Sequence, residues 1–366
     1  MFKSKKDFGR GAGLTLTVFF LTGLLLVGCN VIRSLGRNPS GEALSVIEQQ
    51  PNYRNGQFEN PGTKDSVHVG LHNLLKKRPG NSRPNYSLPV VKTDLVNTRY
   101  AAPTVIWFGH SSFLLKSRTA NILVDPVFNS YAGPIAGIIT AFDGTNAYSV
   151  KDLPVIDVLI ISHDHYDHLD YKTIKSLKSK VKMVVVPQGV GAHFRYWGYD
   201  PKIIHEVNWG EAARVNPELT VTATMARHTS QRSFSARKTL WASYVILADG
   251  YRIFYSGDGG YGIHFKNIGQ QYGPFDLALM ECGQYDHDWP NHHMFPNQTA
   301  QAAADLGTKL VIPIHWGKFA EAYHAWNAPV KQLITAADRL EVKVCVPKLG
   351  EAYTLGNAPL LSHWWE

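Results

Sequence analysis

The sequence contains little cysteine and no long run of basic residues. Three cysteines in 366 residues exclude a disulfide-stapled scaffold and a cysteine-rich zinc finger. The net charge of +8 is spread along the chain, whereas a nucleic-acid footprint needs Lys and Arg clustered on one face. We therefore expect no nucleic-acid partner, and the positive balance only weakly supports an anionic partner such as phospholipid. With 44% hydrophobic and 18% charged residues, the chain has the composition of a globular protein.

The first 30 residues differ from the rest of the chain. Four basic residues within the first ten precede an uncharged apolar run at 14–27, and Cys29 follows almost directly. This order resembles the bacterial lipobox and predicts a signal peptide at 1–28, removed before an acylated Cys29. Asn30 in place of Asp favours the outer membrane, so we expect an anchored lipoprotein that faces the periplasm. The alternative is an uncleaved anchor, although about 14 apolar residues are short for a span.

Residues 29–100 are rich in Asn, Pro, Gly, Arg and Ser and show no sustained period. They predict a tether followed by an extended N-terminal arm that wraps the domain. From Pro103 onward, apolar runs predict strands at 104–108, 112–116, 121–125, 155–161 and 183–187, with a short helix at 171–180. The second half predicts strands at 219–225, 240–248, 251–256, 275–281 and 309–314, with a helix at 296–306. Two similar halves indicate a layered α/β sandwich over 101–366.

One apolar stretch, residues 131–142, is too rich in Gly and Pro to predict a helix. The simpler interpretation is a loop that lies against the core. The alternative is a loop that dips into a membrane or lines an acyl-chain pocket.

Three histidines and a carboxylate follow the strand that ends near Ile161. His163 and His165 are two residues apart, so in an extended loop they point the same way and can hold one metal ion. Asp167 and His168 come about one turn later and can hold a second. Imidazole and carboxylate together suit zinc, iron or manganese better than calcium. A chance cluster of surface histidines does not explain this spacing at the end of a buried strand.

Further ligands are available at the ends of later apolar runs. His228 follows the strand that ends near Met225, Asp258 follows the strand at 251–256, and His315 closes the strand at 309–314. Each alone is equally well explained as a core histidine or a turn aspartate. Together with the cluster they predict a metal centre, because sites of α/β proteins gather at the carboxyl ends of strands.

With these residues the chain resembles the metallo-β-lactamase fold of binuclear metal hydrolases. Within that group it is most similar to the N-acylphosphatidylethanolamine phospholipase D family. The matching stretches lie at 56–61, 107–113, 122–126, 152–157, 162–170, 256–261 and 313–317. The similarity covers roughly residues 53–350. It implies a four-layer αβ/βα sandwich.

The resemblance also implies a ligand set and a substrate. One zinc ion would be held by His163, His165 and His228, and a second by Asp167, His168 and His315, with Asp258 bridging them. His293 matches a family histidine near the substrate phosphate, with His292 and His287 close by. The chain has Gly259 where the family usually has Thr, and the loop at 131–142 also departs from the family.

Two metal ions about 3.5–4 Å apart can share a water and lower its pKa. The implied reaction is therefore hydrolysis of N-acylphosphatidylethanolamine by a metal-bridged hydroxide, giving N-acylethanolamine and phosphatidic acid. His110 and Asp125 are placed to orient ligands or serve a purely structural role. Asp164 is expected to point away and bond to the loop backbone.

Two other functions remain open on the residues alone. An enzyme of the same fold could act on a lactone, a sugar-phosphate lactone or a β-lactam, because the metal ligands do not separate these substrates. A surface lipoprotein with a vestigial site would act by binding, but it would lack a ligand, and here all seven positions are filled.

Overall fold

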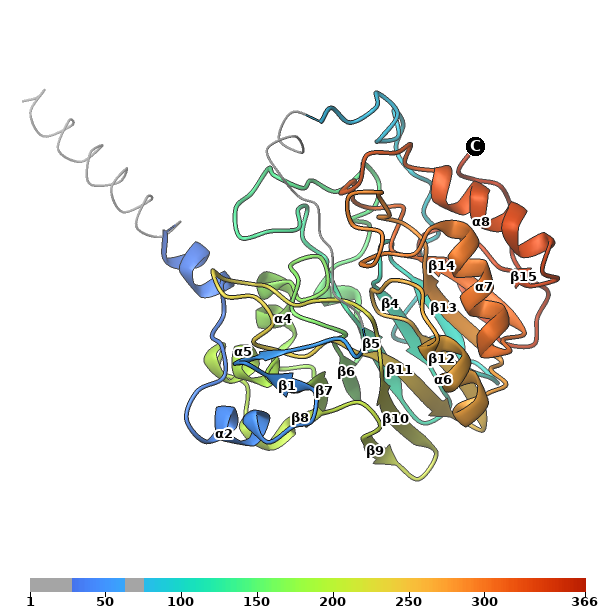
Figure 1. Cartoon of the computed structure of the whole chain (residues 1–366). Coiled ribbons are helices and arrows are strands. Elements are labelled where there is room, and N and C mark those ends of the chain that lie inside the picture. Colours follow the sequence, from blue (N-terminus) through green and yellow to red (C-terminus); the bar gives the residue numbers. More distant parts are fainter. Residues whose placement is uncertain (1–27, 63–75) are drawn as a thin grey trace, which may run out of the picture.

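The computed structural model describes residues 28–62 and 76–366. Within them the chain forms two seven-stranded sheets that lie face to face (Figure 1). The first sheet has the order β16-β3-β4-β5-β6-β7-β8. Its strands are β3 Thr104–Trp107, β4 Phe113–Lys116, β5 Asn121–Val124, β6 Val158–Ile160, β7 Val184–Pro187, β8 Ile204–Val207 and β16 Ala352–Thr354. Strands β3 to β5 pair antiparallel and β5 to β8 pair parallel.

The second sheet repeats this plan, with the order β15-β14-β13-β12-β11-β10-β9. Its strands are β9 Ala212–Asn216, β10 Leu219–Thr224, β11 Ser243–Ala248, β12 Tyr251–Tyr255, β13 Leu277–Glu281, β14 Leu310–Ile314 and β15 Lys343–Val344. Strands β9 to β12 pair antiparallel and β12 to β15 pair parallel. The two similar halves expected from the sequence are therefore confirmed.

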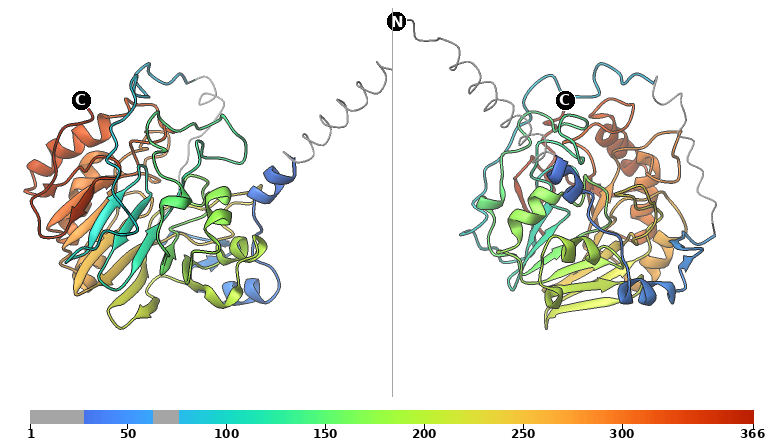
Figure 2. Two further views of the ribbon diagram at one scale, coloured as in Figure 1. Left: turned by 180° about the vertical axis from the view of Figure 1, so that it is seen from behind. Right: turned by 90° about the vertical axis from the view of Figure 1, so that its left-hand side faces the viewer.

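Helices cover the outer face of each sheet (Figure 2). The helices α4 Tyr171–Leu177 and α5 Gly191–Tyr196 lie on the first sheet, and α6 His264–Tyr272, α7 Pro296–Leu306 and α8 Ala328–Asp338 lie on the second. Side chains of a strand alternate between the two faces of its sheet. Leu114 accordingly faces the α4 and α5 layer, while its neighbours Phe113 and Leu115 face the other sheet. Four layers with both faces of each sheet buried give the predicted αβ/βα sandwich.

The N-terminal segment carries short elements that the sequence did not predict. Residues 28–34 form a helix, α2 spans Glu42–Glu48, and β1 Tyr53–Arg54 pairs with β2 Gln57–Phe58. Fully buried Phe58 contacts a cluster that includes Trp241 of the main domain. The arm is thereby fixed beside the chain that carries His228.

The predicted signal peptide at 1–28, with its apolar run at 14–27, lies outside the described residues apart from Gly28. Among the residues that are described, no helix is both long and apolar enough to cross a membrane. Cys29 is exposed, whereas Cys282 and Cys345 are buried and carry free thiols.

Candidate metal centre

Four loops at one edge of the sheets bring the predicted ligands together. The loop after β6 carries His163, His165, Asp167 and His168, and its last residue, Asp170, caps α4 by accepting a hydrogen bond from the backbone of Thr173. The remaining three ligands follow β10, β12 and β14: His228, Asp258 and His315. Because all four strands end at the same edge, the side chains converge there.

The first group consists of three imidazoles. Nε2 of His163 lies 2.9 Å from Nδ1 of His165, and Nε2 of His228 lies 3.3 Å from that same atom. The three candidate ligand atoms lie within 4.8 Å of one another. A hydrogen bond between two imidazoles satisfies only one pair of nitrogens, whereas a single cation can accept all three lone pairs.

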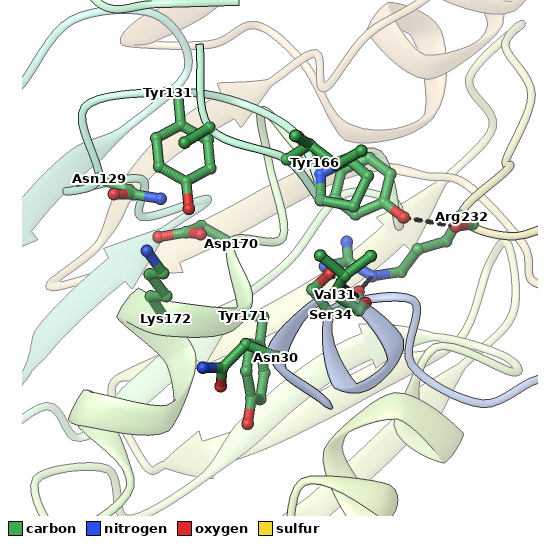
Figure 3. A pocket seen from close by; sticks show the side chains of 14 residues that line it. Asn30, Val31, Ser34, Asn129, Tyr131, Tyr166, Asp170, Tyr171, Lys172 and Arg232 are labelled. Atoms are coloured by element: carbon green, nitrogen blue, oxygen red, sulfur yellow. Dashed lines mark hydrogen bonds between the residues drawn. The ribbon is translucent and has the colours of Figure 1, made fainter. Parts of the chain in front are cut away.

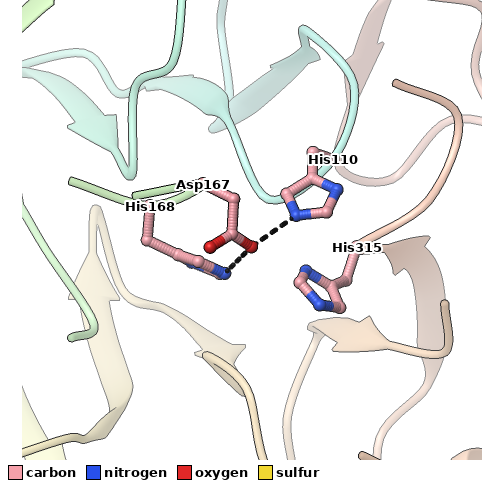
Figure 4. A group of neighbouring side chains, drawn as sticks. All are labelled: His110, Asp167, His168 and His315. Atoms are coloured by element: carbon pink, nitrogen blue, oxygen red, sulfur yellow. Dashed lines mark hydrogen bonds and ion pairs between the residues drawn. The ribbon is translucent and has the colours of Figure 1, made fainter. Parts of the chain in front are cut away.

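The second group combines imidazole with carboxylate (Figure 4). Oδ2 of Asp167 lies 3.1 Å from Nε2 of His168, and the side chain of His315 completes the group. His110 belongs to the same cluster, with its Nε2 2.8 Å from Oδ2 of Asp167. This set of nitrogen and oxygen donors suits zinc, iron or manganese.

Asp258 stands between the two groups. Its Oδ2 lies 3.0 Å from Nε2 of His168 and 3.2 Å from Nε2 of His315. The same oxygen lies 3.8 Å from Nε2 of His163 and 3.9 Å from Nε2 of His228. One carboxylate oxygen is thus close to ligands of both groups, which is the position of a bridge.

The chemistry of these donors fits metal ions. Nε2 of His168, Nε2 of His315 and Oδ1 of Asp258 are buried and have no hydrogen-bond partner in the described part of the chain. Leaving such atoms unpaired is costly, and a cation removes that cost. Burial holds the pKa of His163, His228 and His315 well below the usual range, and neighbouring imidazoles lower it further. These three rings are therefore neutral and offer their lone pairs.

Residues behind the ligands fix their orientation. Nδ1 of His168 lies 2.6 Å from Oδ2 of Asp125, which also accepts a short hydrogen bond from Tyr255. His110, Asp125 and His315 have positive φ angles of 52°, 39° and 65°. A positive φ is costly for a residue with a Cβ and is concentrated at functional sites. His110 and Asp125 both contact candidate ligands, as an orienting role requires.

We predict that Asp125→Asn weakens metal binding by about 10- to 100-fold, the usual cost of losing a group that orients a metal ligand. Asn would present an amide where His168 now meets a carboxylate. Metal affinity measured by competition with a chromophoric chelator checks this. The control is Asp157→Asn, because Asp157 lies before β6 and pairs with Lys182. Equal affinities for the two variants would contradict the prediction.

The structure also joins the predicted residue His293 to a residue that the sequence did not single out, Glu281. Fully buried Glu281, the last residue of β13, places Oε2 3.5 Å from Nδ1 of His293. Burial alone would lower the pKa of His293, but the Glu281 carboxylate raises it to about 9. The His293 ring stacks on His315, with 5.0 Å between centroids. Glu281 thus holds His293 against the candidate centre. The only sequence signal for Glu281 was its position as a lone acidic residue at the end of an apolar strand.

Asp164 differs in part from its expectation. It points away from the ligands, but its Oδ2 contacts side chains: Nε2 of His193 at 3.2 Å and Oγ1 of Thr239 at 2.9 Å.

Buried Arg232 donates to the backbone oxygens of Asp164 and Leu169 and also to that of Ser34. The ligand loop is therefore joined to the helix at 28–34. These partners come from segments far apart in the sequence, which no local pattern links.

A buried lysine behind this edge predicts a pH effect on stability. Lys318 donates from Nζ to the Val127 carbonyl, and burial lowers its pKa from 10.5 to about 7. Between pH 7 and pH 10.5 the Lys318 amine is protonated only in the unfolded chain. The free energy of unfolding therefore rises with pH over this range, by at most about 1.4 kcal/mol per pH unit. Relative to Lys318→Met, the melting temperature of the wild type should rise from pH 7 to pH 9. A constant difference between the two proteins would contradict this.

Known proteins are similar to this chain in sequence and fold. Residues 120–316 match the family described as the β-lactamase superfamily domain. An uncharacterized protein of Mycobacterium tuberculosis is 36% identical over 94% of this chain and 96% of its own length. N-acyl-phosphatidylethanolamine-hydrolyzing phospholipase D 1 of Caenorhabditis elegans is 30% identical over 64% of this chain and 70% of its own length. A metallo hydrolase of the archaeon Ignicoccus hospitalis superposes with a TM-score of 0.55 at 20% identity, covering 70% of this chain and all of that one, which shows the fold alone.

Proposed function

We propose that this chain, which belongs to the β-lactamase superfamily of metal-dependent hydrolases, is a zinc-dependent phosphodiesterase. Its substrate would be N-acylphosphatidylethanolamine, and its products N-acylethanolamine and phosphatidic acid. The observation that carries the proposal is the position of Asp258, whose Oδ2 lies within 3.0 to 3.9 Å of imidazoles from both ligand groups. This arrangement suits a pair of metal ions that act on one phosphodiester.

The choice of substrate rests on the relative from Caenorhabditis elegans, whose name describes this activity. The arm also supports it, because the 56–61 segment reaches the centre. Nδ2 of Asn60 donates to the His228 carbonyl at 2.7 Å, and Nε1 of Trp241 donates to Oδ1 of Asn60 at 3.0 Å. The arm stretch that resembles this phospholipase family therefore positions a ligand.

When bound, two zinc ions would lower the pKa of a shared water and neutralise charge on the phosphate. The protein's own part is to hold the ligands and to exclude water from behind them. Asp125 and His110 fix the second group from behind, and the His292 carbonyl lies 3.0 Å from Nδ1 of His228. His293, which lies beside Glu281 and His315, would contact a phosphate oxygen of the substrate. Hydrogen bonds placed in advance around developing charge are a main source of catalysis.

We also propose that acylated Cys29 anchors the protein in the outer membrane, facing the periplasm. Cys29 is exposed at the start of the helix at 28–34 and directly follows the signal-peptide pattern. A lipid anchor would keep the enzyme at the surface that contains its substrate. Mass spectrometry of the mature protein from membranes would show a diacylated N-terminal cysteine.

The test of the activity uses the zinc-loaded full chain in detergent with four substrates: N-acylphosphatidylethanolamine, phosphatidylcholine, a lactone and a cephalosporin. Products are identified by mass spectrometry. We expect N-acylethanolamine and phosphatidic acid from the first substrate. The dead-site control is Asp167→Asn, which alters a candidate ligand whose Oδ2 lies 2.8 Å from Nε2 of His110 and 3.1 Å from Nε2 of His168.

An intact phospholipid, in a protein that binds two zinc ions, would refute the substrate and leave the metal centre standing. Turnover of the lactone or cephalosporin instead would identify the alternative hydrolase, because the metal ligands alone do not choose among these substrates. Loss of metal binding together with no turnover of any substrate would favour a binding lipoprotein with a vestigial site.

A further inference from the structure

Apolar side chains from three segments line one cavity beside the ligand loop. The cavity holds about 310 Å³ and is lined by Val31 of the helix at 28–34, Ile135 of the loop at 131–142, and Tyr166. Figure 3 shows Tyr131 on one side of it and Val31 on the other. Tyr166 stands between the ligands His165 and Asp167 in the sequence. The cavity is therefore next to the candidate metal centre but separate from its ligands.

The 131–142 loop is a lobe with a buried base and an apolar tip. Its two arms are tied by backbone hydrogen bonds from Ala132 to Ile139 and from Ala141 to Ser130, each 2.8 Å long. Ala132 and Ile139 of the base contact fully buried Phe319. The tip at 133–138 carries no charge, and its residues 135–138 are exposed. The base satisfies the simpler sequence expectation, a loop against the core, but the tip does not.

The apolar residues at this place are among the most exposed of the described chain. Ile135 is 52% exposed, Ile138 63%, and Ile32 of the neighbouring helix 62%. Phe234, two residues beyond the cavity-lining Arg232, is 99% exposed. Ile135 lines the cavity, and each of the other three lies one or two positions in the sequence from a residue that lines it. Exposed apolar side chains gathered in this way mark contact surfaces.

We infer that these residues form a membrane-docking face, in which the tip at 133–138, Ile32 and Phe234 enter the interfacial region of a phospholipid bilayer. The helix at 28–34 supports a bilayer as the occupant, because the uncharged apolar run at 14–27 leads directly into it. Whether that run is a cleaved signal or an anchor, its end marks where the chain meets lipid.

Charge and geometry agree with this occupant. Lys172 lines the cavity, and Arg33 and Arg37 are exposed on and just after the helix. Cations beside an apolar tip suit the anionic phosphates of a lipid surface.

Arg232 joins the helix to the ligand loop through the carbonyls of Ser34 and Asp164. Docking by this face would therefore hold the metal centre at a fixed place next to the bilayer. The inference rests on the proposed membrane location and names the surface that meets the lipid.

The test labels single cysteines in the full chain carrying Cys29→Ser. Because Cys282 and Cys345 are buried, an introduced cysteine is labelled alone. The variants Ile135→Cys, Ile138→Cys and Phe234→Cys would each carry a polarity-sensitive fluorophore. The control is Leu247→Cys, an exposed apolar position on β11 that is paired with Arg252 at the opposite end of the sheet.

On reconstitution into vesicles of phosphatidylethanolamine and phosphatidylglycerol, the three labels should shift to shorter wavelength and be quenched roughly twofold by lipid-attached quenchers. The Leu247 label should not change. Four labels that behave alike would overturn the inference. So would a shift without vesicles that grows with protein concentration, because a second copy would then cover the face. Neither result depends on hydrolysis, so failure of docking and failure of the proposed activity are distinguishable.

Discussion

Asp258→Asn should lower kcat/KM by about a thousandfold, which corresponds to about 4 kcal/mol of lost transition-state stabilisation. Oδ2 of Asp258 is close to imidazoles of both groups, at 3.8 Å from Nε2 of His163 in the first group and 3.0 Å from Nε2 of His168 in the second. An amide is neutral and cannot neutralise two cations. The expected result is loss of activity together with a fall in bound metal from two ions per chain.

The measurement combines steady-state kinetics with elemental analysis of the same sample. Asp249→Asn is a matched control, because Asp249 lies in the turn between β11 and β12, where it contacts Arg118 rather than the ligands. If Asp258→Asn kept two metal ions and wild-type turnover, the carboxylate would not be a bridge.

Removal of the metal ions should abolish activity and lower the melting temperature by roughly 10 °C or more. A ligand present at a thousandfold excess over its Kd contributes about 4 kcal/mol per site to the folded state. The physical reason lies in buried atoms such as Nε2 of His168 and Oδ1 of Asp258, which have no hydrogen-bond partner among the described residues.

This effect is measured by calorimetry on the zinc-loaded protein before and after chelation, with zinc added back at the end. Activity and melting temperature should return together. A chelated protein that melts at the unchanged temperature would show that the cluster satisfies its own polar atoms.

The ligands could be predicted because each has a local signal. His163, His165, Asp167 and His168 are close in sequence, and His228, Asp258 and His315 each end or follow an apolar run. The carboxyl end of a buried strand is where such residues can meet, so the pattern of strands was sufficient to predict one centre, whereas the assignment of the three later ligands to the two groups came from the family resemblance.

The groups that support the ligands could not be predicted in this way. Glu281 and Arg232 meet the site through contacts made by the folded chain, between segments that are distant in sequence. A single acidic or basic residue forms no periodic pattern in the sequence, so its role cannot be predicted from such a pattern. Some missed helices did carry a signal: in α8, Val330, Leu333 and Ala337 recur at helical spacing on the buried face. The six-residue helix α5 is too short for such a pattern.

The most direct test of the proposed reaction is to hydrolyse N-acylphosphatidylethanolamine in water enriched in oxygen-18 and to measure the masses of both products by mass spectrometry. If water attacks phosphorus at the metal centre, phosphatidic acid gains one labelled oxygen and N-acylethanolamine gains none. Label in N-acylethanolamine, or release of diacylglycerol in place of phosphatidic acid, would contradict a phosphodiesterase of the phospholipase D type.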